Sequence, residues 1–147
     1  MTRRGLLPAA LPAALALAGL LLAAPAQPPA SAQSAAAIGP QVNVARLDYG
    51  LRARALADGV WVVEGTNADF SPANGCNIIN TGFIATGAGV LVINTGPSRL
   101  YGEQLRALVE RTTREPVVQV LHLNLHPDYF LGNQAFADVP ITATADT

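Results

Sequence analysis

The stretch Leu121–Phe136 reads Leu-His-Leu-Asn-Leu-His-Pro-Asp-Tyr-Phe-Leu-Gly-Asn-Gln-Ala-Phe, and the interpretation of the whole chain starts from it. Its first residues continue a β-branched and aliphatic run, which predicts a strand. His122, Asn124 and His126 are spaced by two, so their side chains share one side if the strand continues through them. Pro127 cannot donate to a strand ladder and is expected to close the strand.

Metal-ligating residue types gather where this strand is expected to end. A histidine and a carboxylate beside the start of a helix are typical of a metal site, and they predict His126 and Asp128 as metal ligands. The alternative for His126 is a loop histidine bonded to backbone. Asp128 either binds metal, acts in catalysis by orienting the attacking water, or is the N-cap of a short helix expected to start near Tyr129.

Weaker candidate ligands surround this pair. The neutral amide oxygen of Asn124 binds zinc poorly, and Tyr129 can bind metal only as a phenolate, which a pKa of about 10 disfavours. His122 either serves as a substitute metal ligand in place of Asn124 or Tyr129, or is a partly buried histidine near the strand end. Cys76 is a soft ligand type, but a single cysteine is more often a small buried residue.

The N-terminal segment predicts export. The chain has 147 residues and a formal net charge of −1, with no basic patch, which argues against nucleic acid as a partner. Residues 1–32 predict a signal peptide, with a positive start at Arg3 and Arg4, an apolar run at Ala13–Ala24 and a cleavage pattern at Ala30-Ser31-Ala32. We therefore expect a periplasmic or secreted protein with no stable membrane insertion after cleavage.

Two regions follow the predicted signal peptide. Residues 33–57 are interpreted as a tail or linker with a candidate edge strand. Residues 58–147 are interpreted as a partial domain that begins with an Asp58-Gly59 turn. Within that domain, β-branched and aliphatic runs predict strands at Val60–Glu64, Ile78–Ala85, Val90–Asn94, Val117–Leu121 and Ile141–Ala143.

One helix is expected between the third and fourth of these strands. Ser98 is a good N-cap, and Pro116 is expected to end the helix. Because a helix bridges them, Val117–Leu121 is expected to run parallel to Val90–Asn94, which is apolar throughout and predicted to be buried on both faces. The helix face expected in the core consists of Tyr101, Leu105, Leu108, Val109 and Thr112.

The stretch around His126 resembles the His-x-His-x-Asp-His loop of the metallo-β-lactamase superfamily, which carries the first zinc ligands of those hydrolases. Asn124 stands at the first His, His126 at the second, Asp128 at the Asp and Tyr129 at the last His, with Gly132-Asn133 continuing the match. The resemblance implies the N-terminal half of an αββα sandwich, an α/β fold with a mixed sheet and flanking helices. It also implies Zn²⁺ as the cofactor.

Other stretches extend the resemblance. Val90–Gly96 looks like that superfamily's Ile-Asp-Thr-Gly strand end, with Asn94 at the Asp, where it would support the ligands by hydrogen bonding. Several stretches are similar to the exported quinoprotein relay system zinc metallohydrolases, which are associated with pathways that depend on pyrroloquinoline quinone (PQQ). These stretches are Asp69-Phe70-Ser71, Asn74-Gly75, Asn80–Ile84, Gly96–Arg99, Tyr101-Gly102-Glu103 and His126-Pro127-Asp128.

Three functional hypotheses remain open. The first is an exported zinc hydrolase, in which metal-activated water attacks an ester- or lactam-type carbonyl of an unidentified small molecule, with a quinoprotein dehydrogenase pathway as partner. The second is a non-catalytic periplasmic accessory or binding protein with a degenerate metal site. The third is a fragment inactive by itself, because the chain contains two histidines and a catalytic zinc site needs three or more protein ligands.

Overall fold

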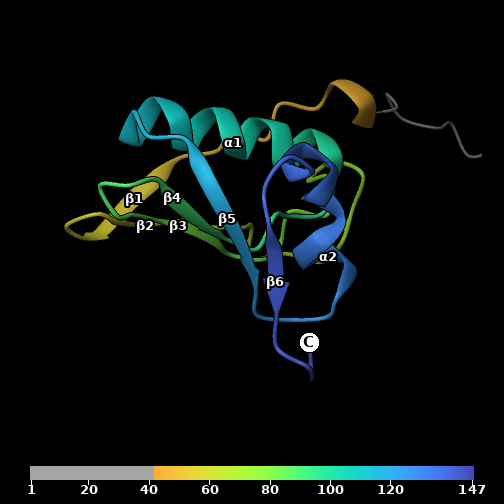
Figure 1. The fold of residues 1–147 in the computed structure, drawn as a ribbon. Coiled ribbons are helices and arrows are strands. Elements are labelled where there is room, and N and C mark those ends of the chain that lie inside the picture. The colour runs from red at the N-terminus through yellow and green to blue at the C-terminus, as the bar shows by residue number, and fades with distance from the viewer. Residues whose placement is uncertain (1–41) are drawn as a thin grey trace, which may run out of the picture. The chain divides into compact units, whose positions relative to one another are not determined.

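The computed structural model describes residues 42–147, which form a six-stranded mixed sheet with a long helix across one face (Figure 1). The predicted signal peptide, residues 1–32, and the first part of the predicted tail lie outside the described residues. The elements in chain order are the 3-10 helix η1 (Val44–Arg46), β1 (Ala53–Ala57), β2 (Val60–Val63), β3 (Thr81–Ala85), β4 (Val90–Ile93), α1 (Arg99–Thr113), β5 (Val117–His122), α2 (Pro127–Phe130), the 3-10 helix η2 (Leu131–Phe136) and β6 (Ile141–Ala143).

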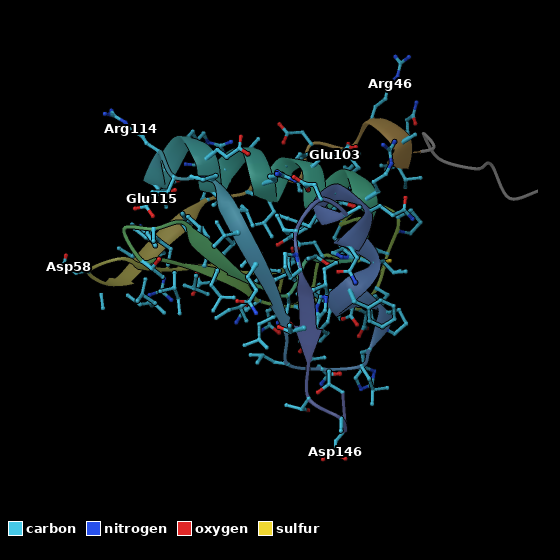
Figure 2. All side chains as sticks on the ribbon, in the orientation of Figure 1. Arg46, Asp58, Glu103, Arg114, Glu115 and Asp146 are labelled. Atoms are coloured by element: carbon cyan, nitrogen blue, oxygen red, sulfur yellow. The ribbon has the colours of Figure 1, made fainter. Side chains whose placement is uncertain are left out.

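The strands lie in the sheet in the same order as in the chain. The first four pair antiparallel, β5 runs parallel to β4, and β6 runs parallel to β5. The predicted parallel pairing across the helix is therefore correct. The candidate edge strand is also present, as β1, and Asp58 lies at the tip of the turn that joins it to β2 (Figure 2).

The strand β3 begins later than the sequence pattern predicts. Ile78 instead donates its backbone N–H to the carbonyl of Cys76, at 3.0 Å. The side chain of Asn80 accepts from the backbone N–H of Gly65 at 3.1 Å. Because these groups close the loop between β2 and β3 onto itself, the ladder with β2 starts only at Thr81.

Helix α1 is bounded by local capping at both ends. The Ser98 hydroxyl accepts from the backbone N–H of Tyr101 at 3.1 Å, as expected for an N-cap. The helix ends at Thr113, before Pro116, because Arg114 adopts a left-handed conformation with φ 60°. The predicted core face is buried except at Thr112, which is half-buried and donates its hydroxyl to the carbonyl of Leu108.

The core lies between α1 and one face of the sheet. Phe83, Val92 and Val120 are cross-strand neighbours on that face and are fully buried. Leu91 and Ile93 alternate with the buried residues of β4 and remain half-buried, so the prediction that this strand is buried on both faces is wrong. The reason is that, within residues 42–147, helix α1 covers only one side of the sheet (Figure 1). No helix in this range is long and apolar enough to cross a membrane.

Candidate functional site

The strand β5 ends at His122, so the continuation that would place three polar side chains on one side does not occur. The backbone N–H of Leu123 donates to the side-chain oxygen of Asn94 at 3.1 Å. One residue later, the Asn124 side chain accepts from the backbone N–H of His126 at 2.9 Å, forming a turn. As a result His122 is buried, Asn124 is half-buried and His126 is exposed.

His122 belongs to a buried hydrogen-bonded cluster. Its Nε2 lies 2.7 Å from the side-chain oxygen of Asn133, which also accepts from the Thr95 hydroxyl at 2.9 Å. Since that oxygen accepts, the geometry assigns the proton to Nε2 and leaves Nδ1 as a buried acceptor with no partner among the described residues. Burial lowers the pKa of His122, partly opposed by the Asn133 hydrogen bond, so the folded protein favours the neutral ring.

The N-cap interpretation of Asp128 is wrong. Helix α2 begins at Pro127, so His126 occupies the N-cap position and Asp128 lies inside the first turn. The cause is Pro127, whose fixed φ suits the first helical position and moves the helix start two residues earlier than expected.

Asp128 and His126 have side chains without partners in the described part of the chain. The Asp128 residue is 9% exposed, yet no hydrogen bond or ion pair joins its carboxylate to any residue from 42 to 147. The His126 side chain makes no capping bond and points into an exposed environment. The Asp128 oxygens are not among the fully buried polar atoms that lack a partner, so the carboxylate can still accept a hydrogen bond or bind a ligand.

His126 and Asp128 line the same cavity, of about 360 Å³. The loop between β2 and β3 forms another wall through Phe70 and Cys76, and Pro97, Pro127 and Leu131 complete the lining. This polar loop therefore borders the candidate site. Its Asn74, however, serves turn formation, because its side-chain oxygen accepts from the backbone N–H groups of Ser71 and Cys76.

The remaining predicted residues lie around this cavity without lining it. Asn94 is 3% exposed and in a left-handed conformation with φ 59°, and its hydrogen bond to Leu123 supports the backbone that leads to His126. Tyr129 contributes its backbone carbonyl, which accepts from the N–H of Thr95 at 2.8 Å. Asn124 shapes the turn as described above.

One contributor was missed at the sequence level. Asn133, in η2, is the acceptor for Thr95, just after β4, and for His122 at the end of β5, and its signal was the Gly132-Asn133 pair, which was interpreted only as part of the resembled motif. Cys76, considered above as a soft ligand type or a small buried residue, is half-buried and lines the cavity.

The donors present fit the beginning of a zinc site and not a whole one. Imidazole and carboxylate are both ordinary zinc ligands, and a catalytic site uses three protein ligands and a water. Within residues 42–147, no three side chains of His, Cys, Asp or Glu lie close enough together to hold a metal as they stand. A complete site therefore needs either movement of side chains or further donors.

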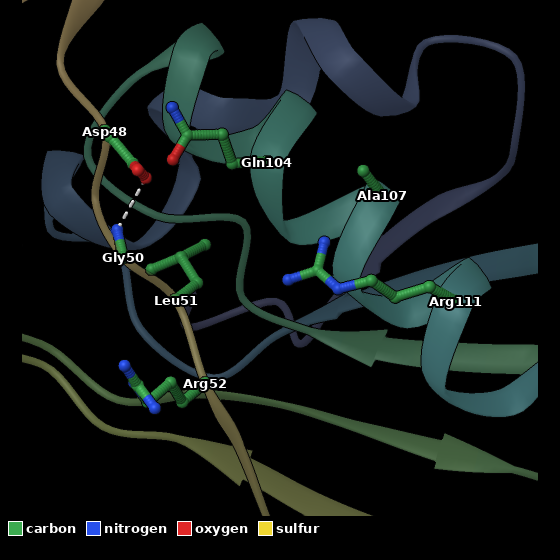
Figure 3. A pocket seen from close by; sticks show the side chains of 7 residues that line it. All are labelled: Asp48, Gly50, Leu51, Arg52, Gln104, Ala107 and Arg111. Carbon is green, nitrogen blue, oxygen red and sulfur yellow. Dashed lines mark hydrogen bonds between the residues drawn. The ribbon is translucent and has the colours of Figure 1, made fainter.

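A separate hollow of about 350 Å³ lies between α1 and the segment that precedes β1 (Figure 3). Arg111 reaches into it from α1, and the Asp48 carboxylate accepts from the backbone N–H of Gly50 at 2.8 Å. None of the predicted site residues lines this hollow. The cavity that His126 and Asp128 line together is the candidate site.

Comparison with known proteins identifies the fold. Neither a family model nor a curated protein sequence matches the chain. Among solved structures, the chain is similar to a metallo-β-lactamase from Hirschia baltica, with a TM-score of 0.55 and 23% identity over 66% of this chain and 44% of that one. It is also similar to the metallo-β-lactamase of Pontibacter korlensis (TM-score 0.52, 18% identity, 66% and 45% covered).

A third similar structure is the metallo-β-lactamase FIM-1 from Pseudomonas aeruginosa in its mono-zinc form, with a TM-score of 0.53 and 17% identity over 65% of this chain and 42% of that one. These likenesses show the metallo-β-lactamase fold, as the sequence predicted. The chain spans less than half the length of the structures it matches.

Proposed function

We propose that this chain is the metal-binding N-terminal part of a metal-dependent hydrolase, with His126 and Asp128 as ligands. The observation that carries the proposal is that an imidazole and a carboxylate, those of His126 and Asp128, line one cavity and are hydrogen-bonded to no residue from 42 to 147. The fold supports it, because zinc is bound in one of the similar structures.

In this proposal the protein's side chains bind and orient. His126 donates a ring nitrogen, and Asp128 binds the ion or holds the attacking water by accepting its proton in a hydrogen bond. Asn94 keeps the intervening backbone in place through Leu123. A bound zinc ion would lower the pKa of its water to about 7 and so supply hydroxide for attack on an ester- or lactam-type carbonyl.

Metal content tests this proposal. Purified full-length protein is analysed for zinc per chain, together with His126→Ala, Asp128→Ala and the control Asp69→Ala, whose carboxylate lies in the bordering loop and does not line the cavity. We expect zinc in the parent and the control and much less in the two cavity variants. Equal zinc in all four proteins would overturn the assignment of His126 and Asp128.

A non-catalytic binding protein is the second candidate. It is favoured by the amide and phenol at two positions where the resembled motif has histidines, Asn124 and Tyr129, neither of which lines the cavity. A protein that folds cooperatively and carries no metal after purification and zinc dialysis would support this candidate over the hydrolase.

Export and a role in quinoprotein metabolism remain parts of the proposal carried by sequence motifs. N-terminal sequencing of protein recovered from the periplasm or medium is expected to begin after Ala32. An intact Met1 would overturn the proposed cleavage without affecting the metal assignment.

A further inference from the structure

We propose that the hollow between α1 and the segment before β1 binds a small phosphate monoester, with Arg52 and Arg111 holding its phosphate group. This hollow has a volume of about 350 Å³ and shares no lining residue with the cavity of His126 and Asp128. The inference is therefore independent of the metal-dependent function proposed above and goes beyond it.

Arg52 and Arg111 carry charges that no acidic side chain of the sequence balances. All ten acidic residues lie within residues 42–147, and none of them forms an ion pair with either arginine. The ion pairs and guanidinium hydrogen bonds of this range belong to three other arginines, Arg54, Arg99 and Arg106. Two unpaired guanidinium groups in the lining of one hollow favour an anionic ligand.

The two arginines belong to different walls of the hollow. Arg111 reaches into it from α1, and Arg52 lies in the segment that leads into β1 (Figure 3). A guanidinium group donates through a planar fork, and a phosphate group has three terminal oxygens, so one phosphate can accept from two arginines. A carboxylate has only two oxygens, which favours phosphate. Leu51 and Ala107 add apolar side chains to the lining, against which the organic part of an ester can pack.

The lining also contains a carboxylate, that of Asp48, which opposes an anion. This side chain accepts from the backbone N–H of Gly50 at 2.8 Å, so it already has a structural role in the turn. Two arginines and one aspartate leave the lining with a single net positive charge. A phosphate monoester carries a charge of about −1.5 to −2 at neutral pH and is attracted to this lining.

The two walls are held together by Gln104 of α1. Its side-chain oxygen accepts from the backbone N–H of Tyr49 at 2.9 Å, and its side-chain nitrogen donates to the carbonyl of Leu47 at 2.7 Å. The segment before β1 is thereby fixed against the helix without a ligand. A hollow of this size with fixed walls is typical of a small-molecule site, because binding then requires little ordering of the protein.

Isothermal titration calorimetry of the full-length protein with phenyl phosphate tests the inference. We expect one phenyl phosphate to bind per chain, and benzoate, which has a carboxylate on the same ring, to bind at least about threefold more weakly. Arg52→Gln and Arg111→Gln should each lower the affinity for phenyl phosphate about tenfold or more, because each removes charge-assisted hydrogen bonds. Benzoate binding as tightly as phenyl phosphate would overturn the assignment to phosphate.

Arg114→Gln is the matched control. Arg114 is exposed, forms no ion pair in residues 42–147 and projects outward beyond the end of α1, away from the hollow (Figure 2). Its substitution removes the same charge from the same end of the helix, and the affinity should change by less than about twofold. Equal losses in Arg114→Gln and Arg111→Gln would show a general positive potential and would overturn the site.

Two further substitutions separate contact with the phosphate from other roles. Asp48→Asn keeps an acceptor for Gly50 and removes the opposing charge, so it should raise the affinity about two- to fivefold. An unchanged or lower affinity would contradict a phosphate beside Asp48. Arg111→Lys keeps the charge without the fork and should bind phenyl phosphate more weakly than the parent. A lower unfolding temperature of Arg111→Gln with unchanged affinity would show that Arg111 only stabilises the C-terminus of α1 and would overturn its role.

His126→Ala distinguishes this hollow from the candidate metal site. Phenyl phosphate should bind to this variant as tightly as to the parent, because His126 does not line the hollow. Loss of affinity in His126→Ala, with full affinity in Arg52→Gln and Arg111→Gln, would place the phosphate at the metal. That result would overturn this inference and leave the proposed function standing. A parent protein that binds no phenyl phosphate would also overturn the inference.

Discussion

The two histidines near the end of β5 lie in opposite environments. His122 is buried, and Asn133 holds it by an oxygen that also accepts from Thr95. His126, four residues later, is exposed and makes no side-chain hydrogen bond in residues 42–147, and nearby Asp128 is buried without a partner. The comparison teaches that His122 helps to hold the fold together. His126 and Asp128, in contrast, keep polar groups that are free to bond a ligand.

The largest expected effect comes from Gly132, on the structural side of this comparison. A Cβ at this position would meet the backbone carbonyl oxygen of Thr95, in the segment after β4 that is hydrogen-bonded to Tyr129 and Gly132. We expect Gly132→Ala to lower the free energy of unfolding by about 3 kcal/mol, measured by urea denaturation. The control is Gly87→Ala, which meets no atom within 4 Å but has φ 81°, and should lose about 1 kcal/mol. Equal losses would contradict the close-packing argument.

The next effect tests the Asn133 cluster directly. Asn133→Ala leaves the buried His122 N–H without its acceptor, and we expect a loss of about 2 kcal/mol in the free energy of unfolding. The half-buried Asn124 serves as the matched control, because its side chain accepts only from a backbone N–H in an exposed turn. Asn124→Ala should lose less than about 1 kcal/mol. A larger loss of stability in Asn124→Ala than in Asn133→Ala would contradict the structural role assigned to Asn133.

The pH dependence of stability should report His122. Since burial lowers its pKa in the folded state below 6.5, the unfolded chain binds the proton more readily, and stability rises with pH. The free energy of unfolding should therefore decrease as the pH falls below about 6.5 and stop decreasing, for this group, below the folded pKa. His122→Gln should flatten this part of the profile in urea titrations, whereas His126→Ala should leave it unchanged.

The smallest effect on stability is expected at the cavity. His126→Ala and Asp128→Asn remove no hydrogen bond or ion pair found among residues 42–147, so each should change the free energy of unfolding by less than about 0.5 kcal/mol. Their metal content should nevertheless fall, which is the signature of residues kept for binding. A large loss of stability in metal-free protein would show that the two residues are structural and would remove the contrast with His122.

Much of the fold follows from local sequence patterns. The hydroxyl of Ser98, the helical spacing of Tyr101 and Leu105, and the apolar run that forms β4 each specify their element by short-range chemistry. The parallel placement of β5 follows because a helix joins it to β4. The candidate ligands were predicted from residue type and spacing together with the resemblance to the metallo-β-lactamase loop, and their roles remain predictions.

The surroundings of those ligands were not predictable from the chain order. The strand β5 ends at His122 because Asn94, distant in sequence, takes the next backbone N–H. The burial of one face of β4 depends on where α1 lies, and the presence of Cys76 in the same cavity as Asp128 depends on how the loop after β2 folds.

The sequence by itself determined the elements, their order and the chemical identity of the candidate donors, because capping, periodicity and residue type act over a few residues. Only the tertiary structure decided which donors share a cavity and which histidine is bonded to Asn133. The physical reason is that hydrogen bonds and burial at the end of β5 depend on groups brought together from β4, η2 and the loop after β2, which no local pattern can place.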